Sequence, residues 1–399
     1  MALSKIDIAN MVTGATPVAN GGTGQTTFAA AGLDKRPNVK SIWINGDMAV
    51  SQRATSVTGK TAGGYYTVDR MQLDISGTIG TWTVAQESLT SGSAYTAGFA
   101  NAYRIDCTSA TASPADAAFL KVISSFEGQD LQLFKKGTAN AEKWTLSFWV
   151  KSNKTGTAQV NLRDMDNTRM IGASYSISSA DTWEHKVCNF AADTTGALDD
   201  DNARSLIVEW WLDGGGNNTS GAMPTAWEAR AVADSMAAGS LDLAGSTDND
   251  WAITGIQLEV GEFSSTTLPP FQHESFGDNL ARCYRYYQMP VHNKDHQGNN
   301  EEYGAFNTGT YSADAYFRAA RPLGVEMRAN PTLKSSSGTN YFFILSGVND
   351  DINDLTLHND SNFKTVWVYN NDEASSTAGQ AGILMANNLS AYIAFDAEL

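Results

Sequence analysis

Hydrophobic and polar residues alternate along most of the chain after Val39, in short segments separated by clusters of Gly, Asn, Asp, Ser and Thr. A period of two residues is typical of β-strands that bury one face. About nine such segments occur in residues 38–272, and no helical segments alternate between them. The pattern therefore predicts an all-β fold class, with a β-sandwich or barrel in this part of the chain.

The segment "TAWEARAVADSMAAG", residues 225–239, interrupts the alternation. Its several alanines, together with Trp227 and Met236, suit a short helix. Because it lies between strand-like segments, we expect this helix to pack on one face of the central sandwich.

Near residue 270 the period changes to that of a helix. In "SFGDNLARCYRYY", Ser275 stands three residues before Asp278, as in a helix N-cap, and the apolar residues fall on one helical face. These apolar residues are Phe276, Leu280, Cys283, Tyr284 and Tyr287. The spacing predicts a linking helix over residues 273–289. About seven or eight short alternating segments follow, and they predict a second, smaller β-sandwich over residues 290–399.

Residues 1–37 form a distinct leader that has too few apolar residues for a core of its own. Its apolar residues include Ile6, Ile8 and Met11, and its phrase "VANGGTGQTT" contains Gly21, Gly22 and Gly24. The phrase does not match a phosphate-binding loop, because no Lys follows these glycines before Lys35. We expect the leader to attach the chain to another body, with glycines that permit positive φ and close approach between chains.

The charge and the cysteines exclude several classes of protein. The net charge is −16, from 27 basic and 43 acidic residues, which argues against nucleic acid and anionic membranes as partners. Cys107, Cys188 and Cys283 are odd in number and far apart, so they form no disulfide framework and no CxxC metal site. The N-terminal segment lacks the apolar run of a signal peptide, and no stretch has the length of a membrane span. Either the chain folds in a reducing cytoplasm or it does not use redox chemistry.

Candidates for metal binding and catalysis carry little specificity. His292 and His296 are four residues apart, but their polar surroundings favour a solvated loop. Acidic clusters could bind Ca²⁺, although none matches an EF-hand and a solvated turn is the favoured explanation of each. The clusters are Asp164 and Asp166; Asp199, Asp200 and Asp201; Asp248 and Asp250; and Asp350, Asp351 and Asp354. No nucleophile elbow is present, and acidic pairs are too common to specify a glycosidase site. We expect no catalytic residue and no cofactor, with Ca²⁺ as the open alternative.

Aromatic residues give a more specific signal. In "KWTLSFWVKS" and "SLIVEWWLDGG", one alternate row of each segment is wholly apolar and should face the core. Trp149 and Trp211 then fall on the outward rows, and Trp211 shares its row with Glu209 and Asp213. An outward Trp ring stacks on the C–H face of a sugar while carboxylates accept hydrogen bonds from its hydroxyl groups. These four residues are candidates for carbohydrate binding. The alternative is that the 225–239 helix or a partner subunit covers this face.

Several phrases resemble bacteriophage fibre proteins, in an order that covers most of the chain. "PVANGGTGQTT" resembles a phrase near the start of phage tail-fibre proteins, and "INGDMAVSQRATS" with "GGYYTVDRMQL" resembles the opening of a phage β-sandwich module. "WTLSFWVKS" is similar to a strand of carbohydrate-binding jelly rolls, and "ITGIQLEVGEFSSTTLPPFQHESFGDNLARCYRYYQ" resembles the segment that closes the phage module. "RPLGVEMRANPTL" and "AYIAFDAEL" resemble fibre C-terminal domains. Met71 is a departure, since the family often has Trp there.

The resemblance implies a non-enzymatic virion protein, most simply a short tail fibre that forms a homotrimer. The leader, with the apolar residues and glycines named above, would attach to other virion proteins. The jelly-roll sandwich and the C-terminal sandwich would project toward a host surface polysaccharide. A head fibre, a capsid decoration protein or a fibre adaptor could carry the same modules. A polysaccharide depolymerase is a further alternative, although neither a long repetitive solenoid nor an identifiable acid pair is present.

Overall fold

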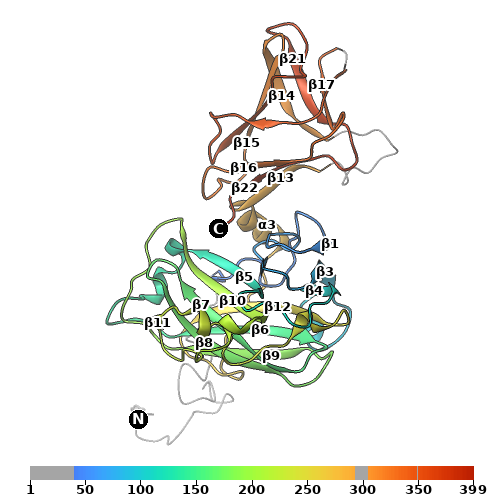
Figure 1. Cartoon of the computed structure of the whole chain (residues 1–399). Coiled ribbons are helices and arrows are strands. Elements are labelled where there is room, and N and C mark those ends of the chain that lie inside the picture. The colour runs from blue at the N-terminus through green and yellow to red at the C-terminus, as the bar shows by residue number, and fades with distance from the viewer. Residues whose placement is uncertain (1–39, 293–303, 348) are drawn as a thin grey trace, which may run out of the picture.

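The alternating segments pair into four antiparallel sheets that build two β-sandwiches, one above the other in Figure 1. The computed structural model describes residues 40–292, 304–347 and 349–399. Strands β1 to β12 form the central sandwich, and strands β13 to β22 form the C-terminal sandwich. The expected all-β fold class is confirmed, since the described chain contains two α-helices, α2 (Ser93–Thr96) and α3 (Phe276–Tyr284).

Each sheet of the central sandwich has six strands. The first sheet has the order β1 (Ser56–Lys60), β3 (Thr81–Ser88), β4 (Asn101–Ser109), β12 (Asp250–Val260), β6 (Trp144–Ser152) and β9 (Glu184–Phe190). The second sheet has the order β11 (Glu228–Ala229), β8 (Arg169–Ile177), β7 (Gly156–Asp164), β10 (Arg204–Gly214), β5 (Phe119–Glu127) and β2 (Gln72–Ser76). Some neighbours, such as β7 and β8, follow each other in sequence, but others, such as β12 with β4 and β10 with β5, are far apart, so the sandwich closes only when distant segments meet.

The inward rows of the two central sheets form one core, as the alternation predicts. The buried rows of β6 and β10 are Trp144, Leu146, Phe148 and Val150, and Leu206, Val208, Trp210 and Leu212. Phe148 and Trp210 meet edge to face across the core, with ring centroids 5.7 Å apart. Burying one large apolar side chain contributes about 1.5–3 kcal/mol, so this layer is a major source of the stability of the central sandwich.

The C-terminal sandwich consists of a three-stranded and a seven-stranded sheet. The smaller sheet has the order β13 (Tyr287–His292), β22 (Tyr392–Asp396) and β16 (Thr332–Ser335). The larger has the order β18 (Asn349–Ile352), β17 (Phe342–Leu345), β21 (Ala381–Ala386), β14 (Ala305–Ala313), β15 (Tyr316–Pro322), β20 (Thr365–Asn370) and β19 (Thr356–Leu357). Phe306 and Phe395 pack between the two sheets, with centroids 6.2 Å apart. Both sheets therefore share one core.

The linking helix is shorter than expected. Ser275 caps it, since its hydroxyl oxygen accepts a hydrogen bond from the backbone N–H of Asp278 at 3.2 Å. The helix ends at Tyr284, and Tyr287 already pairs with Asp396 in the smaller C-terminal sheet. Because the backbone of the last predicted residues forms part of the sheet, the prediction of a helix over all of 273–289 is wrong at its C-terminal end.

The predicted helix over 225–239 is also wrong. The segment contains the two-residue strand β11 and a 3₁₀ helix over Val232–Asp234. Side chains of β7 hold it in this form, because Gln159 donates to the carbonyl of Asp234 at 2.8 Å and Asn161 donates to that of Ser235 at 2.8 Å. These tertiary hydrogen bonds outweigh the helix propensity of the alanines.

Ion pairs with buried carboxylates join the two sandwiches next to α3. Glu127, at the end of β5, accepts two hydrogen bonds from the Arg285 guanidinium, at 2.8 and 2.6 Å. The C-terminal segment reaches back to the central sandwich, where Glu398 binds Arg70 and lies 3.3 Å from Arg53. Because each carboxylate faces a cation from the other sandwich, the joint couples the two bodies electrostatically.

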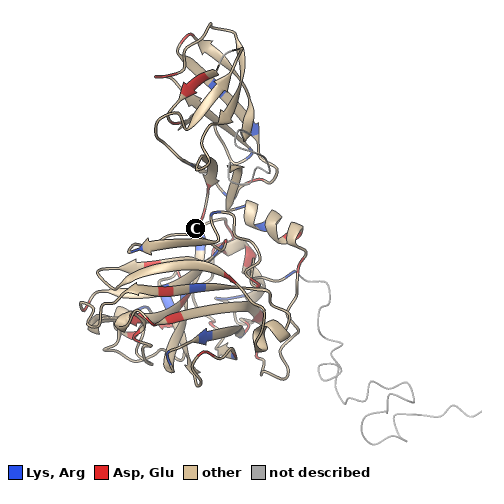
Figure 2. Cartoon of the chain, turned by 90° about the vertical axis from the view of Figure 1, so that its right-hand side faces the viewer, with Lys and Arg blue, Asp and Glu red and all other residues tan. Residues whose placement is uncertain are grey.

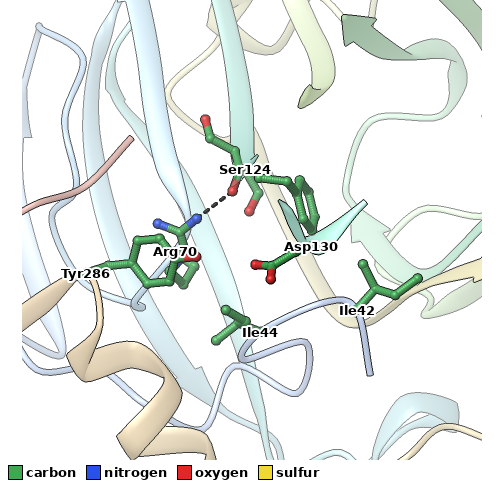
Figure 3. Close-up of a pocket in the computed structure, with 8 residues that line it drawn as sticks. Ile42, Ile44, Arg70, Ser124, Asp130 and Tyr286 are labelled. Atoms are coloured by element: carbon green, nitrogen blue, oxygen red, sulfur yellow. Dashed lines mark hydrogen bonds between the residues drawn. The ribbon is translucent and has the colours of Figure 1, made fainter. Parts of the chain in front are cut away.

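Figure 3 shows the residues that line a small pocket at this joint. The Arg70 guanidinium lies 3.5 Å from the centroid of the Tyr286 ring and donates a hydrogen bond to the carbonyl of Ser125. A pocket of about 10 Å³ remains beside it, lined partly by Ile44 and Asp130. That volume holds about one water molecule, so the joint has a structural role rather than room for a ligand.

The predicted leader lies outside the described residues. Its anchor candidates Ile6, Ile8, Met11, Gly21, Gly22 and Gly24 therefore stay predictions. Within the described ranges, neither helix is long and apolar enough to cross a lipid bilayer.

Candidate functional site

The platform predicted on β10 is not an open surface. Trp211 is 1% exposed, Glu209 is 0% exposed and Asp213 is 3% exposed. The expectation that these three side chains face solvent is wrong. The alternative holds in part, because the 225–239 segment does cover this side of the sheet, as irregular chain rather than as a helix.

The same residues form a structural ion network. The Glu209 carboxylate lies 2.7 Å from the Lys121 ammonium and 3.7 Å from the Arg163 guanidinium, and it accepts a hydrogen bond from the Trp211 indole N–H at 3.1 Å. Burial, the largest single influence, would raise the pKa of Glu209, but Lys121, Arg163 and the hydrogen bond from Trp211 together hold this pKa below its ordinary value. Figure 2 shows that acidic and basic residues occur close together on strands of the central sandwich.

Asp213 also has a structural role. Its carboxylate accepts hydrogen bonds from the backbone N–H groups of Gly214 and Ala244, both at 2.7 Å. Burial raises its pKa in spite of these hydrogen bonds. The carboxylate therefore ties the end of β10 to the loop before β12.

Trp149 is half-buried on the other sheet of the central sandwich. Its ring stacks on His185 of β9, with centroids 5.0 Å apart and planes inclined by 28°. Burial lowers the pKa of His185, with Lys186 as the second cause, so the imidazole is favoured in its neutral form. Since β6 and β10 belong to different sheets, Trp149 and Trp211 do not build one platform.

The acidic clusters are distributed over structural contacts. Asp164 is fully buried against Lys136, and Asp250 binds Arg104 at 2.7 Å. Asp350 accepts a hydrogen bond from the Tyr311 hydroxyl at 2.7 Å. Over residues 40–292, 304–347 and 349–399, no group of three or more His, Cys, Asp or Glu is arranged to hold a metal ion. His296 lies outside these ranges.

The outer face of the seven-stranded sheet carries an aromatic cluster. In β20, Val366 and Val368 are buried, whereas Trp367 and Tyr369 on the alternate row are half-exposed. In the neighbouring β15, Tyr316 and Arg318 occupy the corresponding outward row. His358 follows β19 and contacts the cluster from the edge of the sheet. We call Tyr316, Arg318, His358, Trp367 and Tyr369 the aromatic face.

The rings of the aromatic face lie against one another. Tyr316 and Tyr369 stack with centroids 5.3 Å apart and planes inclined by 24°. His358 meets Tyr369 edge-on at 5.6 Å and lies 6.5 Å from Trp367. The Arg318 guanidinium lies 5.6 Å from the centroid of the Trp367 ring. The arrangement joins several aromatic rings, each with a polar atom, on one sheet surface.

Polar groups surround these rings. Strand register places Thr310 opposite Arg318, Arg318 opposite Tyr369, and Thr356 opposite Tyr369 in one row across four strands. Burial, followed by the neighbouring Tyr369, raises the pKa of Tyr316, which keeps its hydroxyl protonated at neutral pH. The row thus offers apolar ring faces beside hydroxyl and guanidinium donors, a combination that suits an amphipathic ligand.

The sequence contains a signal for this cluster. In "KTVWVYN" the two valines alternate with Trp367 and Tyr369, so the aromatic residues fall on the row opposite the apolar one. In "AYFRAARP" the same reasoning puts Tyr316 and Arg318 on one row. The alternation predicts both segments as strands, but the pairing of β15 with β20, which brings the two rows together, depends on tertiary structure.

No protein-family model and no curated protein matches the chain. Among solved structures, the enzymatically active domain of tailspike protein 4 of bacteriophage CBA120 is 10% identical, with a TM-score of 0.29, over 55% of this chain and 21% of that one. A family 11 carbohydrate-binding module of a cellulosomal cellulase of Clostridium thermocellum is 10% identical, with a TM-score of 0.26, over 52% of this chain and 98% of the module. A CBM4 structure is 8% identical, with a TM-score of 0.27, over 54% and 97%.

Proposed function

We propose that this chain is a bacteriophage virion protein, most simply a tail fibre, that attaches the particle to a host cell-surface glycan. The aromatic face of the C-terminal sandwich is the observation that carries glycan binding. The sequence resemblance to phage fibres supports the place on the virion. In this account the leader, residues 1–37, attaches to other virion proteins, and the C-terminal sandwich is the part that meets the host.

The chemistry of the aromatic face fits a sugar. A pyranose ring has an apolar C–H face that packs on Trp367 or Tyr369, while its hydroxyl groups bind at the rim. In the face, Thr310 and Arg318 supply such groups beside the rings. One stacked ring contributes about 1 kcal/mol beyond the area that it buries, so a single site is weak. A homotrimer would raise the apparent affinity through effective concentration.

We propose that the chain binds without cleaving. Hydrolysis of a glycosidic bond uses two carboxyl groups about 5–9.5 Å apart. Within the described chain, one carboxylate contacts the aromatic face, that of Asp360, which lies 3.4 Å from the His358 Nδ1 atom. The proposal also involves no cofactor, so a chelator should leave binding unchanged. Reducing ends released from a bound polysaccharide, or binding lost in EDTA, would contradict these two parts of the proposal.

The test of glycan binding uses the full chain on an array of bacterial surface polysaccharides. We expect the wild type to bind at least one polysaccharide and Trp367→Ala to lose most of this signal. Tyr95→Ala is the matched control, because Tyr95 is an exposed aromatic residue, 48% exposed, in the central sandwich. An absence of binding on the array, or a Trp367→Ala signal equal to wild type, would contradict the proposal.

The place on the virion needs a separate measurement. Electron microscopy of particles that carry a labelled copy of the chain should place the label on a tail fibre. A label on the head would instead favour a head fibre or a capsid decoration protein, and a label at the base of another fibre would favour an adaptor.

A further inference from the structure

Arg318 occupies the middle of the aromatic face. It lies on β15, directly opposite Tyr369 of β20 on one side and Thr310 of β14 on the other. Its guanidinium is held over the Trp367 ring at 5.6 Å, a cation–π contact that keeps the group close to the sheet. A ligand stacked on these rings would therefore meet the guanidinium.

Within the described chain, no carboxylate pairs with Arg318. In the described chain it has no ion pair and no hydrogen bond to an acidic side chain, whereas Arg104, Arg169, Arg282 and Arg285, which are also partly exposed, each bind one. Acidic partners are not scarce, because residues 304–399 contain ten acidic and five basic residues. Asp360 is nearby, but its carboxylate lies against His358 rather than Arg318. Among the residues that the structure describes, no acidic side chain takes the guanidinium donors of Arg318, so they can serve a ligand.

We propose that Arg318 makes the aromatic face selective for glycans that carry a carboxylate, as uronic acids and sialic acids do. This inference rests on the proposed glycan-binding function and adds the chemical class of the ligand. The planar guanidinium offers two parallel N–H donors whose spacing matches the two oxygens of a carboxylate. The sugar ring would stack on Trp367 or Tyr369 while its carboxylate takes both donors of Arg318.

The alternative ligand is a neutral sugar, whose hydroxyl oxygens also accept from arginine. Hydrogen bonds between charged groups are about twice as strong as neutral ones, and the apolar rings around Arg318 reduce competition from water. The net charge of −16 would repel an acidic glycan at long range, but salt screens this repulsion beyond about 8 Å at physiological ionic strength. The attraction to the Arg318 guanidinium therefore outweighs the screened repulsion, and we expect a preference of about tenfold in affinity for the charged ligand.

The experiment compares polysaccharides that differ only in charge. The probes are alginate, polygalacturonate, hyaluronate and colominic acid, each beside its carboxyl-reduced, neutral counterpart. Affinities are measured for the full-length wild type, Arg318→Gln, Arg318→Lys and Lys334→Gln. Lys334→Gln is the matched control, since it removes the same charge from an exposed position on the other sheet of the C-terminal sandwich. Thermal unfolding verifies that each variant is folded.

We expect the wild type to bind at least one acidic probe about tenfold more tightly than its reduced form. Arg318→Gln should bind both forms equally, Arg318→Lys should keep part of the preference, and Lys334→Gln should keep all of it. The inference is overturned if no acidic probe binds, if the reduced form binds as tightly, or if Arg318→Gln keeps the preference.

Failure of this inference differs from failure of the proposed function. If the wild type binds only neutral polysaccharides of the bacterial array and Trp367→Ala does not bind them, the glycan-binding proposal is supported and the proposed selectivity for carboxylates is contradicted. If Trp367→Ala binds every probe as the wild type does, the aromatic face is not the binding site, and both the proposed function of this face and its selectivity for carboxylates are contradicted.

Discussion

The rings of Tyr316 and Tyr369 lie stacked across neighbouring strands β15 and β20, with centroids 5.3 Å apart and planes inclined by 24°. Both side chains project from regular strands that are fixed by an antiparallel register of six residue pairs. A surface built in this way is ordered before a ligand arrives, which lowers the entropy lost on binding.

The first prediction concerns Tyr369. Replacing it with Ala removes one stacking surface and releases Tyr316, so we expect glycan affinity to fall about tenfold or more. Tyr369→Phe keeps the ring and should stay close to wild type. Since the Tyr369 side chain is half-exposed, the free energy of unfolding should change little in either variant. Equal affinities for Tyr369→Ala and wild type in a glycan titration would exclude Tyr369 from the site.

The second prediction concerns the joint between the sandwiches. In Glu398→Gln, the buried guanidinium groups of Arg53 and Arg70 lose the carboxylate that faces both of them. Breaking a buried ion pair on one side costs about 3–5 kcal/mol, so the variant should unfold at a lower temperature. Asp360→Asn is the control, because Asp360 is 70% exposed. An unchanged unfolding temperature in Glu398→Gln would show that these ion pairs contribute little to the stability of the protein.

The third prediction is a pH dependence that arises from Asp69. Burial raises the pKa of Asp69 from 3.8 to about 6, against the attraction of Arg53. Between these two values the folded state holds a proton that the unfolded state has lost. The stabilisation is therefore complete below the lower pKa and disappears as pH rises through the upper one.

Asp69→Asn should remove this dependence. We expect the wild type to gain about 2 kcal/mol of unfolding free energy relative to Asp69→Asn when pH is lowered from about 7 to about 4.5. Denaturant unfolding of both proteins at the two pH values measures the difference. If the difference in unfolding free energy between wild type and Asp69→Asn is the same at both pH values, Asp69 does not titrate between them.

The fourth prediction separates the network on β10 from ligand binding. Glu209→Gln leaves the buried Lys121 with the partly exposed Asp74, 3.3 Å away, as its remaining carboxylate partner, so we expect the central sandwich to be destabilised by about 1–3 kcal/mol. Because the network lies in the other sandwich, glycan affinity of the folded variant should equal that of wild type. A variant that is folded and stable but no longer binds glycan would restore Glu209 as a ligand-binding residue.

The strands and the core rows were predictable because alternation depends on local sequence. Trp210 and Phe148 both fall on wholly apolar rows, and both are buried where the pattern puts them. The outward rows are less certain, because alternation distinguishes two faces of a strand but does not tell what covers each face. Trp211 is on the predicted row, yet the 225–239 segment lies over its sheet and closes the surface.

The aromatic face shows the same limit of prediction from sequence, here for a surface that stays open. Trp367 and Tyr369 could be assigned to an outward row, but their contact with Tyr316 requires β20 to pair with β15, about 50 residues earlier in the chain. The buried ion pair between Glu209 and Lys121 likewise joins strands that are 88 residues apart. Such juxtapositions come from the strand order, which single-sequence periodicity does not specify.

The most direct test of the account is a titration of full-length chain with the polysaccharide that it binds best on the array. Wild type, Trp367→Ala and Trp149→Ala are compared, each verified as folded by thermal unfolding. The account predicts that Trp367→Ala loses affinity by about tenfold or more while Trp149→Ala keeps the wild-type value. The opposite result, with affinity lost in Trp149→Ala and kept in Trp367→Ala, would place the glycan site on the central sandwich and contradict the account.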